Sequence, residues 1–437
     1  MRYQTIQASI RNAFTDGFFS PLSIDNYRRI LSSNSLWWAT FYMEHIAVGW
    51  MVLELTDSAL MLSFVEFFRR LPFLILGFLA GPIMDRVGRY QSIVFTSIAD
   101  ICLYMLLAML IWSESLELWH IYVITFIIGC LWGTSWPARR GILPDIVGKE
   151  RTVDVLALDR GGQGTARIVG PALAGVVVAT YGVIGCFVVI IAAQVLNLGA
   201  LWGMRLSPTA QSSPETSPET SLESSKENDE QPIQESPIQQ IRAGLAYARH
   251  HPIVIGILLS TLVANLLIFP FQTLLPVFAR DVLNQGPVGL GWLGAAPGIG
   301  TFLGLLVVTL WRRHGGRYGN NGSVFIFGTM FFCITLFAFA ISPIYWMSWS
   351  ALAISGIGQV SFALLQVGMM MLVVEDEMRN RMMGLLVLAI GIGPFGRLMV
   401  GFLAELYGAP FTVAMTSSVG LVTMVLIAIL IPKLRRV

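Results

Sequence analysis

Apolar segments of about 20 residues recur along the whole length of this sequence, and they leave few folds open to it. Each segment is long enough for a helix to cross the hydrocarbon core of a bilayer. Helix is the expected conformation, because lipid offers no hydrogen-bond partners to an isolated strand. We therefore predict an all-α integral membrane protein with twelve transmembrane helices, at roughly residues 30–55, 59–82, 91–112, 118–138, 154–180, 183–204, 253–279, 289–311, 322–342, 345–373, 382–404 and 410–432.

Composition argues against the alternative, a soluble protein with an unusually large core. Of the 437 residues, 55% are hydrophobic and only 12% are charged, and the mean hydropathy is +0.69. Soluble domains carry roughly twice that charged fraction. The polar residues also gather in short breaks between the apolar segments instead of forming a stripe along each helix.

The basic residues predict the orientation of the helices. The breaks after the odd-numbered segments contain one Lys or Arg in all, Arg280, whereas the even-numbered breaks and both ends of the chain are rich in them. Loops rich in Lys and Arg stay on the cytoplasmic side of a membrane. We therefore expect a multi-pass protein of the cell (inner) membrane with both termini in the cytoplasm.

A polar segment divides the chain into two parts of six predicted helices each. Residues 207–251 are rich in Ser, Pro, Glu and Thr and have few large apolar side chains, which predicts a disordered cytoplasmic linker. The predicted domains are therefore an amino-terminal bundle at 30–206 and a carboxy-terminal bundle at 252–437. Residues 1–29 are expected to form a cytoplasmic segment without a cleavable signal peptide.

The two bundles resemble each other in sequence. Residues 170–182, GPALAGVVVATYG, align with residues 396–408, GRLMVGFLAELYG, so that three glycines and one tyrosine match at a constant offset. This pattern is typical of an internal duplication. Two pseudo-symmetric six-helix repeats predict a transporter whose substrate site lies near the midplane, between halves that rock about it.

The break between the second and third segments has a distinctive composition. It reads GPIMDRVGRY at residues 81–90. An aspartate there can cap a helix, and the arginines anchor the loop on the cytoplasmic side. A plain anchor would need the arginines alone, so the full spacing calls for a further role. The residues that define this spacing are Gly81, Asp85, Arg86, Gly88 and Arg89.

This spacing resembles the G-x-x-x-D-R-x-G-R signature of the major facilitator superfamily, with Tyr90 at the following, usually basic, position. The resemblance implies that the loop acts as a latch, which closes the cytoplasmic side in the outward-open state. Residues 43–60, 137–150 and 375–384 are similar to the exporter branch, the transmembrane secretion effectors, that includes the enterobactin exporter. The resemblance therefore implies export of a small organic molecule such as a drug, siderophore or metabolite.

The segment RIVGPALAG, at residues 167–175, is similar to the small-residue motif of antiporters, although Ala166 and Ala174 replace two of its glycines. It implies exchange of the cargo, with protons as the expected coupling ion. Gly170, Pro171 and Gly175 are expected to let helices pack closely. Close packing can also be their whole role.

Ionisable side chains at membrane depth cost a few kcal/mol each, roughly, and usually mark a pathway. Glu66 precedes two arginines by three and four residues, so part of this group can instead be a self-neutralised structural cluster. The candidates for a proton and substrate pathway are Glu44, His45, Glu66, Arg69, Arg70, Asp159, Arg160, Arg167 and Arg397.

Glu44 is the leading candidate for the proton site. It has no basic residue three or four positions away, and it lies on the helix that lines the central cavity in the superfamily. The adjacent His45 should point to another side of that helix, and either residue can also be a packing residue. Arg160 and Arg167 share one helical stripe, and with Arg397 they predict a basic lining for an anionic or carbonyl-rich substrate.

Other classes of function find little support in the sequence. The four cysteines have no metal-ligand spacing, and there is no ATP-binding loop. We expect no metal, no cofactor, no enzymatic activity and no nucleic acid, and a monomer whose partners are the lipid bilayer, a small-molecule substrate and protons. An uptake carrier or facilitator on the same fold remains open, as does a non-transporting membrane sensor.

Overall fold

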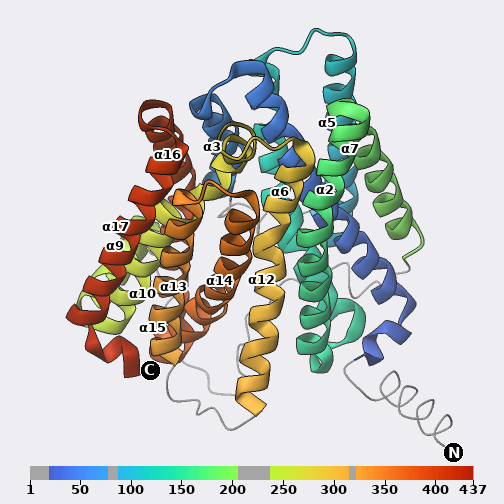
Figure 1. The fold of residues 1–437 in the computed structure, drawn as a ribbon. Helices are drawn as coiled ribbons and strands as arrows, with labels where there is room; N and C mark the ends of the chain where they lie inside the picture. The colour runs from blue at the N-terminus through green and yellow to red at the C-terminus, as the bar shows by residue number, and fades with distance from the viewer. Residues whose placement is uncertain (1–18, 77–86, 205–236, 314–320, 437) are drawn as a thin grey trace, which may run out of the picture.

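The computed structural model describes residues 19–76, 87–204, 237–313 and 321–436, and every regular element in those ranges is a helix. The helices of the first half lie mainly on the right of Figure 1, and those of the second half lie mainly on the left. The first turn of α2 and the carboxy-terminal helix η7 both lie at the lower end of the view, so the two ends of the described chain face the same side (Figure 1).

In the described part of the first half, five long helices follow a short 3-10 turn. The bounds are η1 Ser20–Ser23, α2 Asp25–Thr56, α3 Ala59–Leu76, α5 Arg89–Trp112, α6 Leu118–Val147, the short 3-10 helix η2 Lys149–Arg151, and α7 Thr152–Trp202. α7 contains two helical segments that join at Gly182, whose φ of 71° is not helical. α6 continues well beyond the predicted end at residue 138, and this extension brings Arg139 into a helix.

The second half begins with an irregular segment and continues with regular helices. The irregular segment comprises α10 Pro252–Val263, η3 Ala264–Ile268, η4 Phe269–Leu274, α11 Leu275–Val277 and η5 Phe278–Val282. The regular helices are α12 Pro287–Arg313, α13 Asn321–Ile341, α14 Tyr345–Val373, α15 Asp376–Gly391, α16 Gly393–Tyr407 and α17 Ala409–Leu430, followed by η7 Pro432–Arg436.

Nine helical stretches in the described ranges are long and apolar enough to cross a membrane. One of them is the whole of α7, which covers two of the predicted segments. α2 and α3 coincide with the first two predicted segments but are outside the nine. The membrane character of the fold is therefore clear, and the count of twelve crossings stays a prediction.

The backbone supports the internal duplication. Gly182 and Gly408, which match in the sequence alignment of the halves, have φ angles of 71° and 83°. Side chains other than glycine rarely adopt this region. Each glycine follows an exposed tyrosine, Tyr181 or Tyr407, and begins the next helical segment. In each half, a tyrosine followed by a glycine with positive φ therefore separates two consecutive helical segments at the matched position.

The prediction of disorder over residues 207–251 is wrong for its last part. Helix α9, Pro237–His250, lies there, and the earlier part falls outside the described residues. Ala248 is buried, and a side chain at Gly244 would touch Met382 and Leu385 of α15. α9 is therefore stabilised by packing on α15, which composition alone does not reveal.

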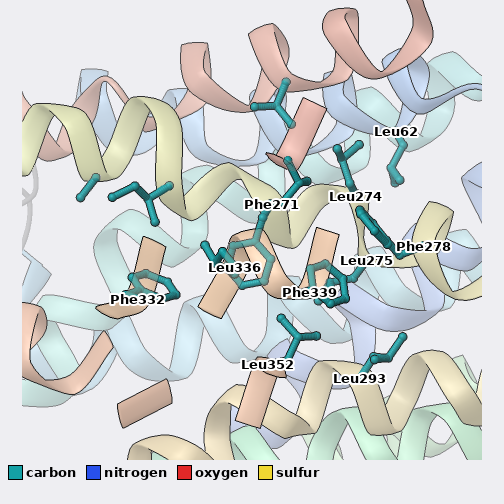
Figure 2. Close-up of a cluster of buried hydrophobic side chains, with 14 of the residues drawn as sticks. Leu62, Phe271, Leu274, Leu275, Phe278, Leu293, Phe332, Leu336, Phe339 and Leu352 are labelled. Atoms are coloured by element: carbon teal, nitrogen blue, oxygen red, sulfur yellow. The ribbon is translucent and has the colours of Figure 1, made fainter. Parts of the chain in front are cut away.

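The irregular segment of the second half passes through a core of aromatic side chains. Figure 2 shows Phe271 and Phe278 from this segment beside Phe339 of α13. The ring centres of Phe278 and Phe339 are 4.4 Å apart, and the side chains of Phe271, Phe278 and Phe339 are all fully buried. Pro270 and Pro276 remove backbone donors and interrupt the α-helix. Such a break is tolerated at membrane depth where protein surrounds it or where it lines a cavity.

Candidate functional site

A buried ion pair joins the first two long helices. Arg69 of α3 donates two hydrogen bonds to Glu44 of α2, one to each carboxylate oxygen, and the Nη2–Oε1 distance is 2.7 Å. The two side chains are only 4% and 1% exposed. Glu44 has no basic residue three or four positions away on its own helix, and the structure supplies a basic partner from α3. Two-point pairing satisfies both oxygens of the carboxylate.

A second carboxylate, Glu66 of α3, lies at the centre of the cluster. Its Oε1 atom is 3.0 Å from Nδ1 of His45 and 3.4 Å from Nε of Arg69, and its Oε2 atom is 3.7 Å from Nε of Arg70. The expected pairing of Glu66 with the arginines three and four residues later is thus present. His45 contacts Glu66 and the adjacent Glu44 contacts Arg69, so both side chains reach the same cluster on α3, and the expectation that His45 points to another side of α2 is not confirmed.

The second half contributes Arg397 of α16 to the same cluster. Its Nε atom is 3.6 Å from Oε2 of Glu66, and the arginine is 5% exposed. Its Nη1 atom donates a long hydrogen bond of 3.3 Å to the carbonyl of Gly393 in its own helix. Glu66 is therefore in contact with charged groups of both halves.

Two cavities adjoin the cluster, and both are lined by residues of both halves. The smaller has a volume of about 240 Å³, and the larger about 430 Å³. Arg70, Trp132 and Gln272 line both, so the cavities are neighbours. His45, Arg167 and Pro171 line the smaller cavity, and Asn265, Gln359 and Arg397 line the larger.

Of the two arginines in the predicted basic stripe of α7, only Arg167 lines one of these two cavities. Arg167 lines the smaller cavity and donates to Gln359 of α14 over 2.5 Å, which links the halves. Arg160 is exposed, donates to Gln163 over 3.1 Å, and lines neither cavity. Asp159 is buried and accepts a hydrogen bond of 2.7 Å from Asn34 of α2, away from both cavities.

A buried polar network centred on Arg139 was not predicted from the sequence. This arginine of α6 is 2% exposed and donates to Ser33 and Asn34 over 2.9 Å each. Its guanidinium also lies 5.0 Å from the ring centre of Trp37. Polar residues inside the apolar segments, Asn34 and Asn197 among them, were the available signal. The network holds α2, α6 and the end of α7 together.

Only part of the predicted latch lies within the described residues. Gly81, Asp85 and Arg86 fall outside them. Gly88 has a φ of 89°, a conformation that favours glycine. Arg89 donates to Asp145 over 2.7 Å and to the carbonyl of Gly141 over 3.0 Å, so it fixes the start of α5 to α6.

The two halves meet through two equivalent helix pairs, α7 with α12 and α3 with α16. A Cβ atom on Gly175 would lie 2.9 Å from Cα of Gly291, and a Cβ on Gly401 would overlap Ser63. Gly175 and Gly401 are matched positions of the duplication. Gly170 plays a similar part within the first half, because a Cβ there would lie 2.9 Å from that of Tyr42. Close packing is thus a role that the structure assigns to the small residues.

Polar contacts reinforce these interfaces at the end where α3 begins. Arg280 donates to the carbonyl of Leu53 over 2.8 Å and pairs with Asp57. Glu405 accepts hydrogen bonds from Ser58 Oγ over 3.0 Å and from the amide of Leu60 over 3.2 Å. We call these contacts of Arg280 and Glu405 the Ala59-end contacts. They join the halves at this end of the molecule.

No group of three or more His, Cys, Asp or Glu side chains within the described ranges is arranged to hold a metal ion. The chemistry of the site is that of ion pairs, hydrogen bonds and aromatic walls around a cavity. Such a site can bind an organic molecule and exchange protons, and it can change the contacts between two rigid halves.

Solved structures share the fold. The nucleoside transporter NupG has a TM-score of 0.70 at 12% identity, over 94% of this chain and 99% of its own. A peptide transporter of the POT family has a TM-score of 0.73 at 12% identity, over 94% of this chain and 95% of its own. At these identities the similarity concerns the fold alone.

Sequence relatives include efflux proteins and a staphyloferrin A transporter. The multidrug efflux pump Tap of Mycolicibacterium fortuitum is 25% identical over 89% of this chain and 91% of its own length. The staphyloferrin A transporter of Staphylococcus aureus is 28% identical over 34% of this chain and 38% of its own. Macrolide efflux protein A of Streptococcus pyogenes is 21% identical over 62% of this chain and 63% of its own.

A family model described as transmembrane secretion effector matches residues 16–437, nearly the whole chain. The match agrees with the all-helical membrane fold. The protein belongs to the transmembrane secretion effector family of major facilitator transporters.

Proposed function

We propose that this protein is a secondary active exporter, which moves a small organic molecule out of the cell by alternating access in exchange for protons. The family and its relatives, which include multidrug, macrolide and staphyloferrin A transporters, support the export of small molecules. Relatives of this kind are transporters and not enzymes. The observation that carries the mechanism is the position of Glu66, which contacts charged groups of both halves beside the cavities.

The contacts between the halves support the alternating-access part of the proposal. The Ala59-end contacts and the close glycine packing lie toward one end of the helices. If both termini are cytoplasmic, as the distribution of basic residues predicts, that end faces outward. The structure would then be a state in which the outer side is closed, and export requires these contacts to open.

We assign the proton-exchange step to Glu66 and His45 in preference to Glu44. Both oxygens of Glu44 are occupied by Arg69, deep in the protein. Glu66 contacts several basic side chains at 3.0–3.7 Å and has no two-point partner. Its partner His45 lines the smaller cavity. A proton that arrives through the cavity can therefore reach this pair. Protonation of Glu66 would cancel its attraction for Arg397 and loosen the contact between the halves.

Proton exchange can be measured in inverted membrane vesicles with an acidified lumen. Addition of a transported compound should dissipate the pH gradient with the wild-type chain, and Glu66→Gln should abolish this response. Glu54→Gln is the matched control, because Glu54 is exposed on α2. A wild-type response that survives in Glu66→Gln would remove this residue from the coupling step.

The same vesicles separate the export proposal from its alternatives. An exporter accumulates the compound inside inverted vesicles and needs the gradient to do so. A facilitator would only equilibrate it, an uptake carrier would move it in the opposite direction, and a sensor would produce no flux. Oligomeric state is a separate question, and we expect a monomer, because both cavities are lined within one chain.

A further inference from the structure

The charged side chains that line the two central cavities are all basic. Arg70 lines both cavities, Arg167 and His45 line the smaller one, and Arg397 lines the larger one. No Asp or Glu side chain is among the residues that line either of these two cavities. The walls therefore carry positive charge toward the space that a cargo would occupy.

These arginines are incompletely neutralised by the protein. The Nε atoms of Arg70 and Arg397 are buried and have no hydrogen-bond partner among the described residues. Glu66 is the carboxylate nearest to both, at 3.7 and 3.6 Å, and it is also shared with His45 and Arg69. Arg167 is bonded to Gln359, a neutral amide. A single carboxylate cannot balance both the partly exposed guanidinium of Arg70 and the buried one of Arg397, so a negative group in the cavity would be stabilised there.

Aromatic side chains form a second part of the lining, beside aliphatic residues and neutral amides. Trp132 lines both cavities and stacks on Trp136 with ring centres 5.7 Å apart and an interplanar angle of 12°. Phe41 also stacks with Trp132, with ring centres 6.0 Å apart and an interplanar angle of 22°. Planar rings prefer such surfaces, which offer apolar contact without a charge.

We propose that the cargo is an amphipathic organic anion, an aromatic molecule that carries a carboxylate or a similar acidic group. This rests on the proposed function and names its substrate class. The aromatic body would lie against Trp132 and Trp136, and the acidic group would pair with Arg70 and Arg397. A cation of the same shape would meet two under-neutralised guanidiniums in a medium of low dielectric constant, and the site would repel it.

Two xanthene dyes of similar size and opposite charge test this proposal. Fluorescein is an anion with a carboxylate, and rhodamine 123 is a cation in which that carboxylate is esterified. Binding of each dye to the purified full chain in nanodiscs is measured by equilibrium dialysis, with empty nanodiscs as the blank. We expect saturable binding of fluorescein that is at least tenfold tighter than that of rhodamine 123.

Variants of Arg70 and Arg397 test whether these two arginines cause the preference for fluorescein. Arg397→Gln and Arg70→Gln should each weaken fluorescein binding about tenfold or more, and Arg397→Lys should recover part of it because the charge is retained. Arg249→Gln, on the exposed face of α9, should bind like the wild type. A circular dichroism melt of each variant shows whether weaker binding reflects loss of folding instead.

Dye binding and dye transport are measured separately, so the results distinguish failure of the anion-site proposal from failure of the exporter proposal. Fluorescein that binds but does not accumulate in inverted vesicles would uphold the anion site and contradict the exporter. Rhodamine 123 that binds as tightly as fluorescein, or accumulates in its place, would overturn the anion site and leave the exporter intact. Absence of fluorescein binding to folded wild-type protein would likewise overturn the anion site.

Discussion

Arg397 of α16 lies with its Nε atom 3.6 Å from Oε2 of Glu66 on α3, and this contact joins the two halves of the chain at the edge of the larger cavity. The duplication places Pro171 at the position that matches Arg397, and Pro171 lines the smaller cavity. The two halves are therefore alike in backbone but not in charge. Because Arg397 enters a cluster otherwise built by the first half, relative motion of the halves must change this contact.

The first prediction concerns that contact. Arg397→Gln removes the positive charge that the second half offers to Glu66, so coupled transport should fall tenfold or more while the chain stays folded. The measurement is proton flux on substrate addition in inverted vesicles. Arg249→Gln is the control for loss of an arginine in the second half. Normal flux in Arg397→Gln would show that the cycle does not depend on this contact.

The second prediction separates stability from transport at Glu44 and Arg69. Removal of one partner from a buried pair leaves an uncompensated charge, which costs about 3–5 kcal/mol. Glu44→Ala should therefore lower the melting temperature of the purified protein strongly. Arg69→Met in the Glu44→Ala background should recover part of that loss, because it removes a guanidinium that has lost its two-point partner and keeps only the longer contact with Glu66.

A thermal melt of the two single variants and the double variant measures this coupling. Losses that simply add would mean that the two side chains do not stabilise each other. A stable Glu44→Gln variant with no proton flux would instead restore Glu44 as the proton site.

Much of the fold could be predicted from the sequence, because membrane helices are governed by length and hydropathy. α14 was expected at 345–373 and occupies Tyr345–Val373. Two of the errors of extent, α6 beyond residue 138 and α9 within the expected linker, have the same origin. Both segments contain polar residues and are stabilised by packing on neighbouring helices, and hydropathy does not measure packing.

The sequence indicated which charged residues form the candidate site, but it indicated less well which of them pair with each other. Spacing along one helix indicated the contacts of Glu66 with Arg69 and Arg70, which lie one turn away. The partner of Glu44 comes from another helix, so no spacing rule could indicate it. Arg139 was missed for a related reason: its helix was expected to end before it, and its partners Ser33 and Asn34 lie about a hundred positions earlier.

The third prediction follows from the Arg139 network. Arg139→Met keeps much of the apolar stem but removes the donors to Ser33 and Asn34, whose buried oxygen atoms would then lose a partner. Loss of a charged hydrogen-bond donor from a buried site costs about 1.5–3 kcal/mol. We expect a lower melting temperature with an unchanged dye preference, since Arg139 lines neither central cavity. A changed preference would place the network in the substrate pathway.

The fourth prediction uses the close approach of Gly175 and Gly291. Gly175→Ala adds a Cβ that would lie 2.9 Å from Cα of Gly291 and closer still to the carbonyl of Pro287, both of which belong to the backbone of α12 and cannot rotate away. The closed interface should therefore be destabilised, and the opposite state should gain population. Gly161→Ala is the matched control in the same helix, because a Cβ there meets nothing within 4 Å.

A reducible cross-link across the same end of the molecule reports the population of the closed state. Ser58→Cys with Glu405→Cys, in a background where the four native cysteines are replaced by serine, places thiols at positions whose side chains now share a hydrogen bond of 3.0 Å. A short bifunctional methanethiosulfonate reagent should link the two thiols and stop transport until a reductant is added. Gly175→Ala should slow the cross-linking several-fold, and Gly161→Ala should not. Transport that continues through the cross-link would mean that this end never opens, and alternating access would then need another hinge.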